Sequence, residues 1–146
     1  MHVPIQKIIA GLGGDRYLKN PVRHEFDLLT LISQGLPMES VAFLQQKLGF
    51  TNKEMSHILA ISESTYQRRI RTKSRLTQDE TEKAISLSEL YAKGIEVFED
   101  QADFDYWLNS PIPALQDNKP VDLLSSMLGR KQVMNVLNAL LHGLFS

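Results

Sequence analysis

A cluster of cationic side chains between Ser62 and Arg75 is the part of the sequence whose residue types best suit a chemical role. Five cations stand here against one anion, Glu63, so the segment carries a charge of +4, while the whole chain carries −1 and the remainder therefore −5. A basic stripe on an otherwise acidic chain is typical of a surface that binds phosphate groups. The alternative is a solvated helix pair whose arginines form ion pairs with nearby carboxylates.

The same segment carries side chains that can read base pairs. A glutamine amide suits adenine and a guanidinium suits guanine, because each can form two parallel hydrogen bonds to that base. We expect the base contacts to come from Ser64, Thr65, Gln67 and Arg68. We expect the phosphates to be neutralised by Arg69, Arg71, Lys73 and Arg75.

Two short helices joined by a tight turn are predicted to position these side chains. A capping box, in which the side chains of Thr51 and Glu54 each accept from the other's backbone N–H, begins the first helix. Residues 60–62 form the turn, and Ser62 is a favourable N-cap for the second helix, which runs to Ile70. This arrangement is typical of a helix-turn-helix, whose second helix enters the DNA major groove.

Helices are also predicted before this pair. Several closely spaced glycines disfavour a helix in residues 1–20, which we expect to form a flexible arm. Helices are expected over residues 23–33 and 38–49, where apolar residues recur at helical spacing. Together with the pair, they form a predicted helix-turn-helix DNA-binding domain over residues 21–76.

Residues 77–146 are predicted to form a second helical domain. Thr77 and Glu80 make another capping box, which begins a long helix that ends near Phe98. Shorter helices are expected to begin near Asp103, Pro120 and Arg130, and Gly143 is expected to follow the last of them. No segment has the pattern of a strand, so the predicted fold class is all-α.

The start of this second domain is strongly acidic. Residues 77–110 contain nine carboxylates and two lysines, a net charge of −7. One interpretation is a solvated outer face. The other is that the acidity keeps this half away from DNA and available to a basic partner.

Catalytic and metal-binding chemistry are not indicated by the sequence. The chain has no cysteine, and its four histidines are scattered without a metal-binding spacing. The carboxylates near residue 100 lack the glycine and glutamate of a calcium-binding loop. We therefore expect no catalytic residues, no metal, no cofactor and no enzyme activity.

No apolar run approaches the roughly 20 residues that cross a bilayer, and no signal peptide is predicted, so we expect a cytoplasmic protein.

The order of these features resembles one family, the Xre/MbcA/ParS antitoxins of bacterial toxin–antitoxin pairs. In the N-terminal half the matching residues are Gly35-Leu36-Pro37, Ser64 to Arg69 and Leu76 to Glu80. In the C-terminal half they are Trp107-Leu108, Pro111, Leu115, Pro120 to Leu124, Gly129, Val133, Leu137 and Gly143. The resemblance covers residues 35–146. The sequence departs from the family at residues 116–118, where a glycine-rich turn is more usual.

This resemblance implies a specific function and a set of partners. Family members form homodimers, bind operator DNA to repress their own operon, and neutralise a RES-domain toxin encoded beside them. RES toxins degrade NAD, and related antitoxins cover the toxin's active-site entrance with their C-terminal region. The resemblance therefore assigns residues 77–146 to dimerisation and toxin binding, and it assigns the apolar tip, Leu144, Phe145 and Ser146, to the toxin contact.

Two other functions are compatible with the residues. One is a stand-alone homodimeric helix-turn-helix transcriptional regulator, without a toxin partner, whose acidic half dimerises or senses a ligand. The other is a protein-interaction module whose helix-turn-helix has lost DNA binding.

The large apolar residues Trp107, Leu123 and Leu137 are expected to pack in the core, as such side chains do at helical spacing.

Overall fold

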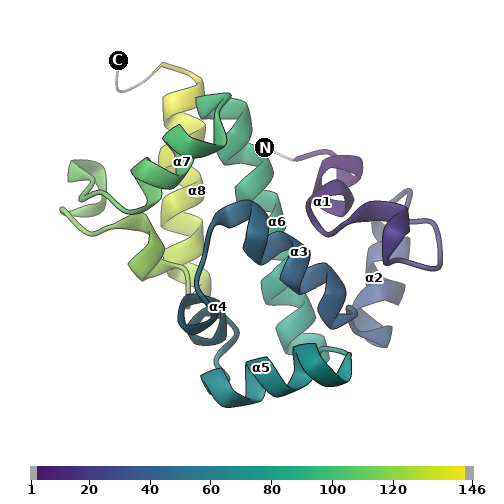
Figure 1. Ribbon diagram of the computed structural model, residues 1–146. Helices are drawn as coiled ribbons and strands as arrows, with labels where there is room; N and C mark the ends of the chain where they lie inside the picture. The colour runs from purple at the N-terminus through teal and green to yellow at the C-terminus, as the bar shows by residue number, and fades with distance from the viewer. Residues whose placement is uncertain (1–2, 144–146) are drawn as a thin grey trace.

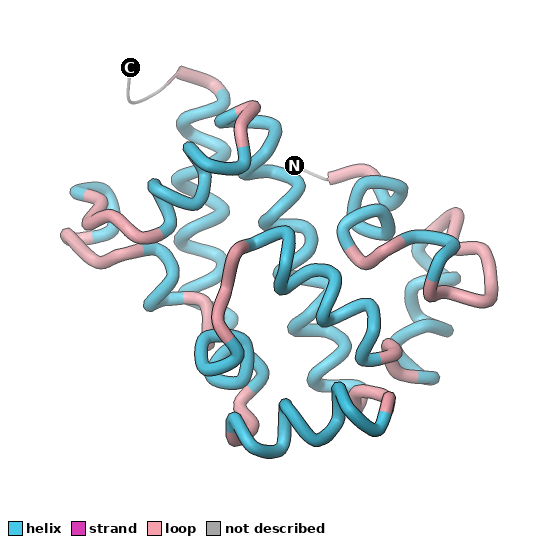
Figure 2. The backbone as a smooth tube through the Cα atoms, viewed as in Figure 1, coloured by secondary structure: helices cyan, strands magenta, loops and turns pink. Residues whose placement is uncertain are grey.

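The computed structural model describes residues 3–143, and this part of the chain is helical (Figure 1). Its α-helices are α1 (Ile5–Gly11), α2 (Glu25–Gln34), α3 (Met38–Leu48), α4 (Asn52–Leu59), α5 (Glu63–Thr72), α6 (Gln78–Phe98), α7 (Gln101–Leu108) and α8 (Met127–Leu141). Short 3-10 turns lie at η1 (Gly14–Arg16), η2 (Pro113–Leu115) and η3 (Pro120–Leu123). Figure 2 shows only helices and loops over these residues, which confirms the all-α prediction.

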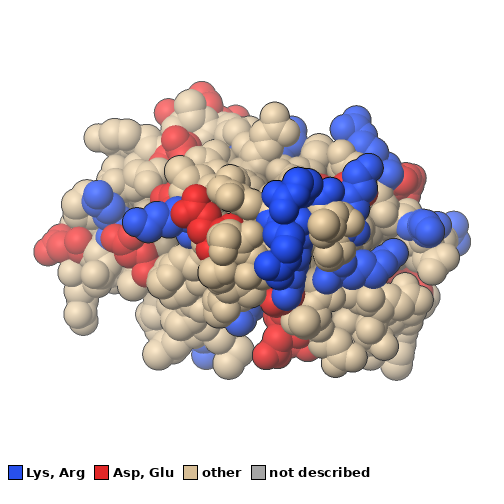
Figure 3. All heavy atoms as spheres, turned by 60° about the horizontal axis from the view of Figure 1, so that its bottom comes forward, with Lys and Arg blue, Asp and Glu red and all other residues tan. Residues whose placement is uncertain are grey.

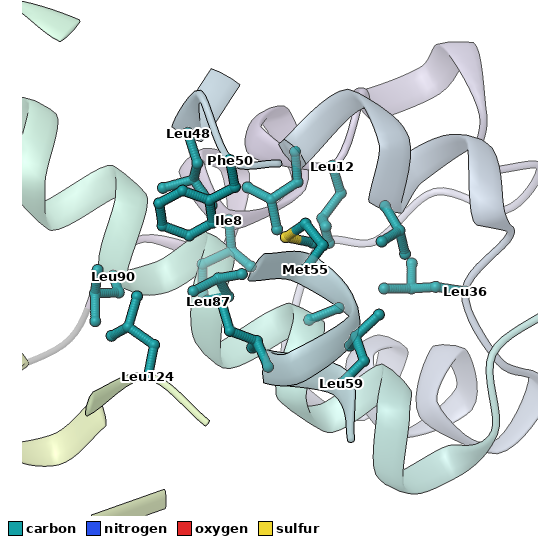
Figure 4. Close-up of a cluster of buried hydrophobic side chains, with 14 of the residues drawn as sticks. Ile8, Leu12, Leu36, Leu48, Phe50, Met55, Leu59, Leu87, Leu90 and Leu124 are labelled. Atoms are coloured by element: carbon teal, nitrogen blue, oxygen red, sulfur yellow. The ribbon is translucent and has the colours of Figure 1, made fainter. Parts of the chain in front are cut away.

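Helix α6 is the central element, and most other helices pack around it. It contacts α1, α2, α3, α4, α7 and α8. Its inward side chains Ala84, Leu87 and Leu90 are buried. Figure 4 shows Leu87 close to Ile8, with Leu90 beside Leu124, so apolar side chains from distant parts of the chain meet on this one helix. Burial of this kind is the main favourable contribution to folding.

The N-terminal residues differ from the flexible arm that the sequence predicts. Ile8 and Leu12 are buried, and α1 packs against α6. The Ser88 hydroxyl of α6 donates a hydrogen bond to the Ile8 carbonyl at 2.7 Å. Gly11 permits this approach, since a Cβ there would lie 2.4 Å from Ser88 Oγ. The glycines of this region therefore serve close packing and a tight turn.

Two predicted helix starts in the C-terminal half are wrong by several residues. Helix α7 is capped by Asp100, whose side chain accepts from the Ala102 N–H at 2.8 Å, and Asp103 lies in its first turn. Helix α8 begins before Gly129, because Ser126 caps it and accepts from the Gly129 N–H at 2.9 Å. A Cβ on Gly129 would lie 1.8 Å from the Leu123 carbonyl oxygen, so this glycine allows η3 to approach the helix.

The turn at residues 116–118 contains backbone in the left-handed conformation, although none of its residues is glycine. Gln116 and Asp117 have φ values of 56° and 63°, in the left-handed region. Asn118 closes the turn by pairing with Ile112 in an isolated bridge. This turn is therefore strained, because side chains with a Cβ rarely adopt this conformation.

Candidate functional site

The predicted helix-turn-helix is formed by α4 and α5. Thr51 Oγ1 accepts from the Glu54 N–H at 3.0 Å, and the Thr51 N–H donates to Glu54 Oε1 at 2.9 Å, which confirms the capping box. The chain turns at Ala60, with φ 60° and ψ 41°. Ser62 then caps α5 and accepts from the Thr65 N–H at 3.1 Å. These local bonds fix the two helix starts, as the sequence predicts.

Tyr66 sets the rotation of α5 about its axis. The side chain is fully buried, and its hydroxyl donates to Gln45 Oε1 of α3 at 2.5 Å. Burial raises the pKa of Tyr66 well above its usual value, so the hydroxyl keeps the proton that it donates. Gln45 in turn donates to Asn52 Oδ1 at 2.9 Å. With Tyr66 directed inward, the opposite side of α5 faces solvent.

That solvent-facing side carries most of the predicted base-reading residues. Residues spaced by three and four positions share one side of a helix. On α5 this exposed side is made of Ser64, Gln67, Arg68 and Arg71, which we call the α5 stripe. Lys73, the exposed C-cap of the helix, extends its charge. In Figure 3, which looks towards this side of the molecule, lysine and arginine side chains gather into one patch.

Five predicted contact residues form side-chain hydrogen bonds within the protein: Ser64 bonds with Ser62 at 3.2 Å, Gln67 donates to Glu63 Oε2 at 3.4 Å, and the others are Arg69, Arg75 and Thr65. The Arg69 guanidinium donates to Glu80 Oε1 at 2.7 Å, and the same oxygen accepts from the Thr77 N–H at 2.9 Å. Arg69 thus joins α5 to the buried Glu80 in the first turn of α6. Arg75 Nη1 donates to the Gly35 carbonyl at 2.7 Å, although much of its side chain is exposed. The Thr65 hydroxyl accepts from Ser62 Oγ at 2.8 Å and lies beside the stripe.

The C-terminal half is held together by an aromatic cluster on α6 and α7. Trp107 lies 5.6 Å from Phe98 and 6.2 Å from Phe104 between ring centroids. A Cβ on Gly94 would lie 2.1 Å from the Phe104 ring, so this glycine lets the ring rest on α6. Leu137 is fully buried, whereas Trp107 and Leu123 are half-buried. Leu137 therefore packs in the core as predicted, and Trp107 and Leu123 are partly buried and pack against the core.

Two cations of this half are buried. Arg130 is 8% exposed, and it donates to the Leu124 carbonyl at 2.9 Å and to Ser86 Oγ at 3.2 Å. Burial lowers the pKa of Arg130, because desolvation disfavours its charged form. Lys93 is 3% exposed and forms an ion pair with Glu96 at 3.2 Å. Arg130 thus links α8 to α6 and to Leu124, whereas the ion pair of Lys93 lies within α6.

Exposed apolar side chains are the surface feature that sequence reasoning missed. Over residues 3–143, large hydrophobic side chains are exposed on α2, α7 and α8, at Phe26, Leu29, Tyr106, Met127 and Leu128. Helical periodicity could have revealed Phe26 and Leu29, which lie on the side of α2 opposite Leu31. The predicted toxin-binding tip, Leu144, Phe145 and Ser146, lies outside the described residues.

Metal binding and membrane insertion find no support in the part of the chain that the structure describes. Residues 3–143 contain no group of three His, Asp or Glu side chains that could hold a metal ion. Within the same residues, every helix is too short or too polar to cross a bilayer.

Two family models match successive parts of the chain. The model described as the antitoxin Xre-like helix-turn-helix domain matches residues 27–88. The model described as the antitoxin Xre/MbcA/ParS C-terminal toxin-binding domain matches residues 93–143. The first match ends and the second begins within α6, so this helix belongs to both halves.

Relatives and a solved structure agree with these matches. The chain is 26% identical over 120 residues to the protein named Antitoxin Xre of Photorhabdus laumondii subsp. laumondii, covering 82% of this chain and 81% of the relative. It is 24% identical over 139 residues to the Prs ADP-ribosylating antitoxin of a Sphingobium species, covering 89% and 85%. A chain of the M. tuberculosis MbcT–MbcA toxin–antitoxin complex has the same fold, with a TM-score of 0.60, 22% identity, and coverage of 75% of this chain and 96% of that one.

Proposed function

The chain belongs to the Xre/MbcA/ParS family of antitoxins, which are not enzymes, and from this premise we propose which toxin it neutralises and how it acts on DNA. The toxin is a RES-domain enzyme that degrades NAD and is encoded in the same operon. The antitoxin covers the active site of this toxin. As a homodimer in the cytoplasm it also represses the operon through its helix-turn-helix.

One observation carries this proposal: a single chain joins an exposed basic recognition helix to a toxin-binding domain through one shared helix, α6. The α5 stripe supplies two guanidinium groups and an amide at the surface. The match to a toxin-binding domain over residues 93–143 supports a protein partner for the other half. The name of the Sphingobium relative refers to ADP-ribosylation, a chemistry that uses NAD as donor, and this favours a toxin that acts on NAD.

The apolar tip, Leu144, Phe145 and Ser146, is proposed to enter the toxin's active-site pocket. The apolar side chains of Leu144 and Phe145 suit a pocket, because a few buried anchors supply most of the binding energy of an interface. Helix α8 ends at Leu141, and Gly143 follows with φ 73°.

Deletion of residues 144–146 tests this assignment. We expect the shortened protein to keep its fold and its DNA binding but to lose protection of cells that express the neighbouring toxin gene. Cellular NAD measured after toxin induction should fall with the shortened protein and stay constant with the full chain. Tyr106→Ser, which removes an exposed apolar side chain from the same half, is the control and should still protect. Protection by the shortened protein would show that the tip is not the toxin contact.

A further inference from the structure

A cavity lies at the edge of the helix-turn-helix domain, between residues 17–22, helix α2 and Arg75. Its volume is about 650 Å³, within the range of about 300–1,000 Å³ that is usual for small-molecule sites. One of its walls, residues 17–22, precedes residue 27, at which the match to the antitoxin helix-turn-helix model begins. The known functions of the family therefore do not explain this cavity.

Half of the residues that line the cavity are apolar. They are Tyr17, Leu18, Pro21, Val22, Leu31 and Pro37. Leu18 and Leu31 are buried, whereas Val22 and Pro37 are half-buried. Contact with an apolar body removes such surface from water, which is favourable. These walls therefore favour a ligand that carries an aliphatic or aromatic group.

Arg75 is held at the cavity by bonds to the segment that follows α2. The Leu76 N–H donates to the Leu36 carbonyl at 2.9 Å, and Arg75 Nη1 donates to the Gly35 carbonyl at 2.7 Å. Gly35 permits this approach, since a Cβ there would lie 2.2 Å from the Leu76 carbonyl oxygen. A guanidinium has five N–H donors, so the bond to Gly35 orients the group and leaves donors for a ligand.

The charges around the cavity favour an anion. Its lining contains two cations, Lys19 and Arg75, and one acid, Asp27, which together carry +1. Asp27 Oδ2 already accepts from the backbone N–H groups of Arg23 at 2.8 Å and His24 at 3.3 Å. The acid is thus engaged at the start of α2, whereas both cations are exposed at the cavity.

We propose that this cavity binds a small organic acid, whose carboxylate pairs with Arg75 and Lys19 and whose apolar body covers the apolar walls. The inference goes beyond the proposed function, which gives no role to a small molecule. A carboxylate suits Arg75 because its two oxygens accept two parallel N–H bonds from a guanidinium. The sequence assigns Arg75 to a DNA phosphate instead. A backbone phosphate has no apolar body, however, and leaves the walls at Leu18 and Val22 uncovered.

The site adjoins the end of the recognition helix. The C-cap of α5 is Lys73, and the Ser74 N–H donates to the Arg69 carbonyl of α5 at 3.1 Å. Arg75 is the next residue, so a ligand that pairs with its guanidinium contacts the segment that ends α5. We therefore expect the ligand to change the surroundings of residues 73–76 as well as those of the cavity.

The test uses 4-phenylbutyrate as the probe, and 4-phenylbutyramide as an uncharged compound of similar shape. NMR titration of the full chain, followed through its backbone amide signals, locates the binding site and measures the affinity without DNA. Arg75→Gln and Lys19→Gln each remove one charge from the lining. Arg16→Gln is the matched control, because Arg16 is exposed nearby but does not line the cavity. Thermal unfolding checks that each variant stays folded.

We expect 4-phenylbutyrate to shift the signals of residues 17–20, 30–34 and 73–76. Arg75→Gln should weaken its binding at least about tenfold, because hydrogen bonds between charged groups are lost. Lys19→Gln should weaken it about two- to fivefold, as an exposed ion pair contributes less. Arg16→Gln should leave the affinity unchanged, and the uncharged amide should bind at least about tenfold more weakly than the acid.

Three results would overturn the inference. One is equal binding of the acid and the amide. Another is an affinity for the acid that neither Arg75→Gln nor Lys19→Gln changes, and Lys19→Gln alone decides this if Arg75→Gln does not fold. The third is that a random DNA duplex shifts the cavity signals while 4-phenylbutyrate does not, which would assign the two cations to the DNA backbone.

Discussion

On α5 the side chains of Arg68 and Arg71 are exposed to solvent, whereas in the C-terminal half Lys93 and Arg130 are only 3% and 8% exposed. A buried charge is costly unless it is paired or hydrogen-bonded, so the buried cations are held by partners within the fold. The exposed cations are available to an external anion. The same residue types therefore have a structural role where they are buried and a candidate binding role where they are exposed.

The halves also differ in the charge that surrounds their exposed apolar side chains. In the toxin-binding domain, Tyr106, Met127 and Leu128 are exposed, although residues 77–110 carry a charge of −7. Salt screens interactions between exposed charges but has little effect on apolar contacts. Binding by α5 should therefore weaken steeply with salt, whereas binding of the toxin through the apolar residues Leu144 and Phe145 should depend on salt much less.

The largest expected effect is on stability and comes from the buried cation Arg130. Arg130→Ala removes the donors to the Leu124 carbonyl and Ser86 Oγ, and we expect it to lower the free energy of unfolding by about 2–4 kcal/mol. Urea denaturation measures this change. Lys131→Ala, at the exposed next position, should change stability by less than about 0.5 kcal/mol. Equal effects of the two substitutions would show that burial does not distinguish these cations.

The next effect is on DNA binding and comes from the exposed Arg68. We expect Arg68→Ala to weaken operator binding by about 1–3 kcal/mol and to relax sequence specificity, because a base contact is lost. Lys73→Ala should weaken binding to all sequences about equally, since a phosphate contact carries no sequence information. Titrations with operator and random duplexes measure both. Equal losses on the two duplexes for Arg68→Ala would contradict its assignment to a base.

The smallest effect separates two arginines on α5. Arg71→Ala should reduce the slope of log affinity against log salt by about 1, because one phosphate contact and its released counterion are lost. Arg69→Ala should leave this slope unchanged and lower thermal stability instead, because Glu80 loses its ion pair. Binding measured at several salt concentrations gives both slopes. An equal reduction of the slope by both substitutions would show that Arg69 also neutralises a phosphate, as the sequence predicts.

Features fixed by neighbouring residues could be predicted from the sequence. The caps at Thr51, Ser62 and Thr77 each accept from a backbone N–H three residues later, and this spacing is visible in the sequence. The exposed stripe on α5 follows from the same local periodicity once Tyr66 is known to face inward.

Features fixed by distant residues could not be predicted. The ion pair of Arg69 depends on where the start of α6 lies in space, and the sequence does not give this position. The order of residues 3–18 depends on Ser88 and the α6 surface, whereas the local glycines suggested a flexible arm. The start of α8 differs from the prediction for a local reason: the predicted helix begins at Arg130, after Gly129, although this glycine lies within the helix that Ser126 caps.

The most direct test of the central claim is co-expression with the adjacent reading frame. An affinity tag is placed on that partner alone, and light scattering measures the mass of the eluted material. We expect a stable complex with a whole-number ratio of the two chains, which persists at high salt. If the tagged partner elutes alone and this protein forms a separate dimer, the antitoxin function is contradicted. A free-standing helix-turn-helix regulator then becomes the better explanation of the α5 stripe.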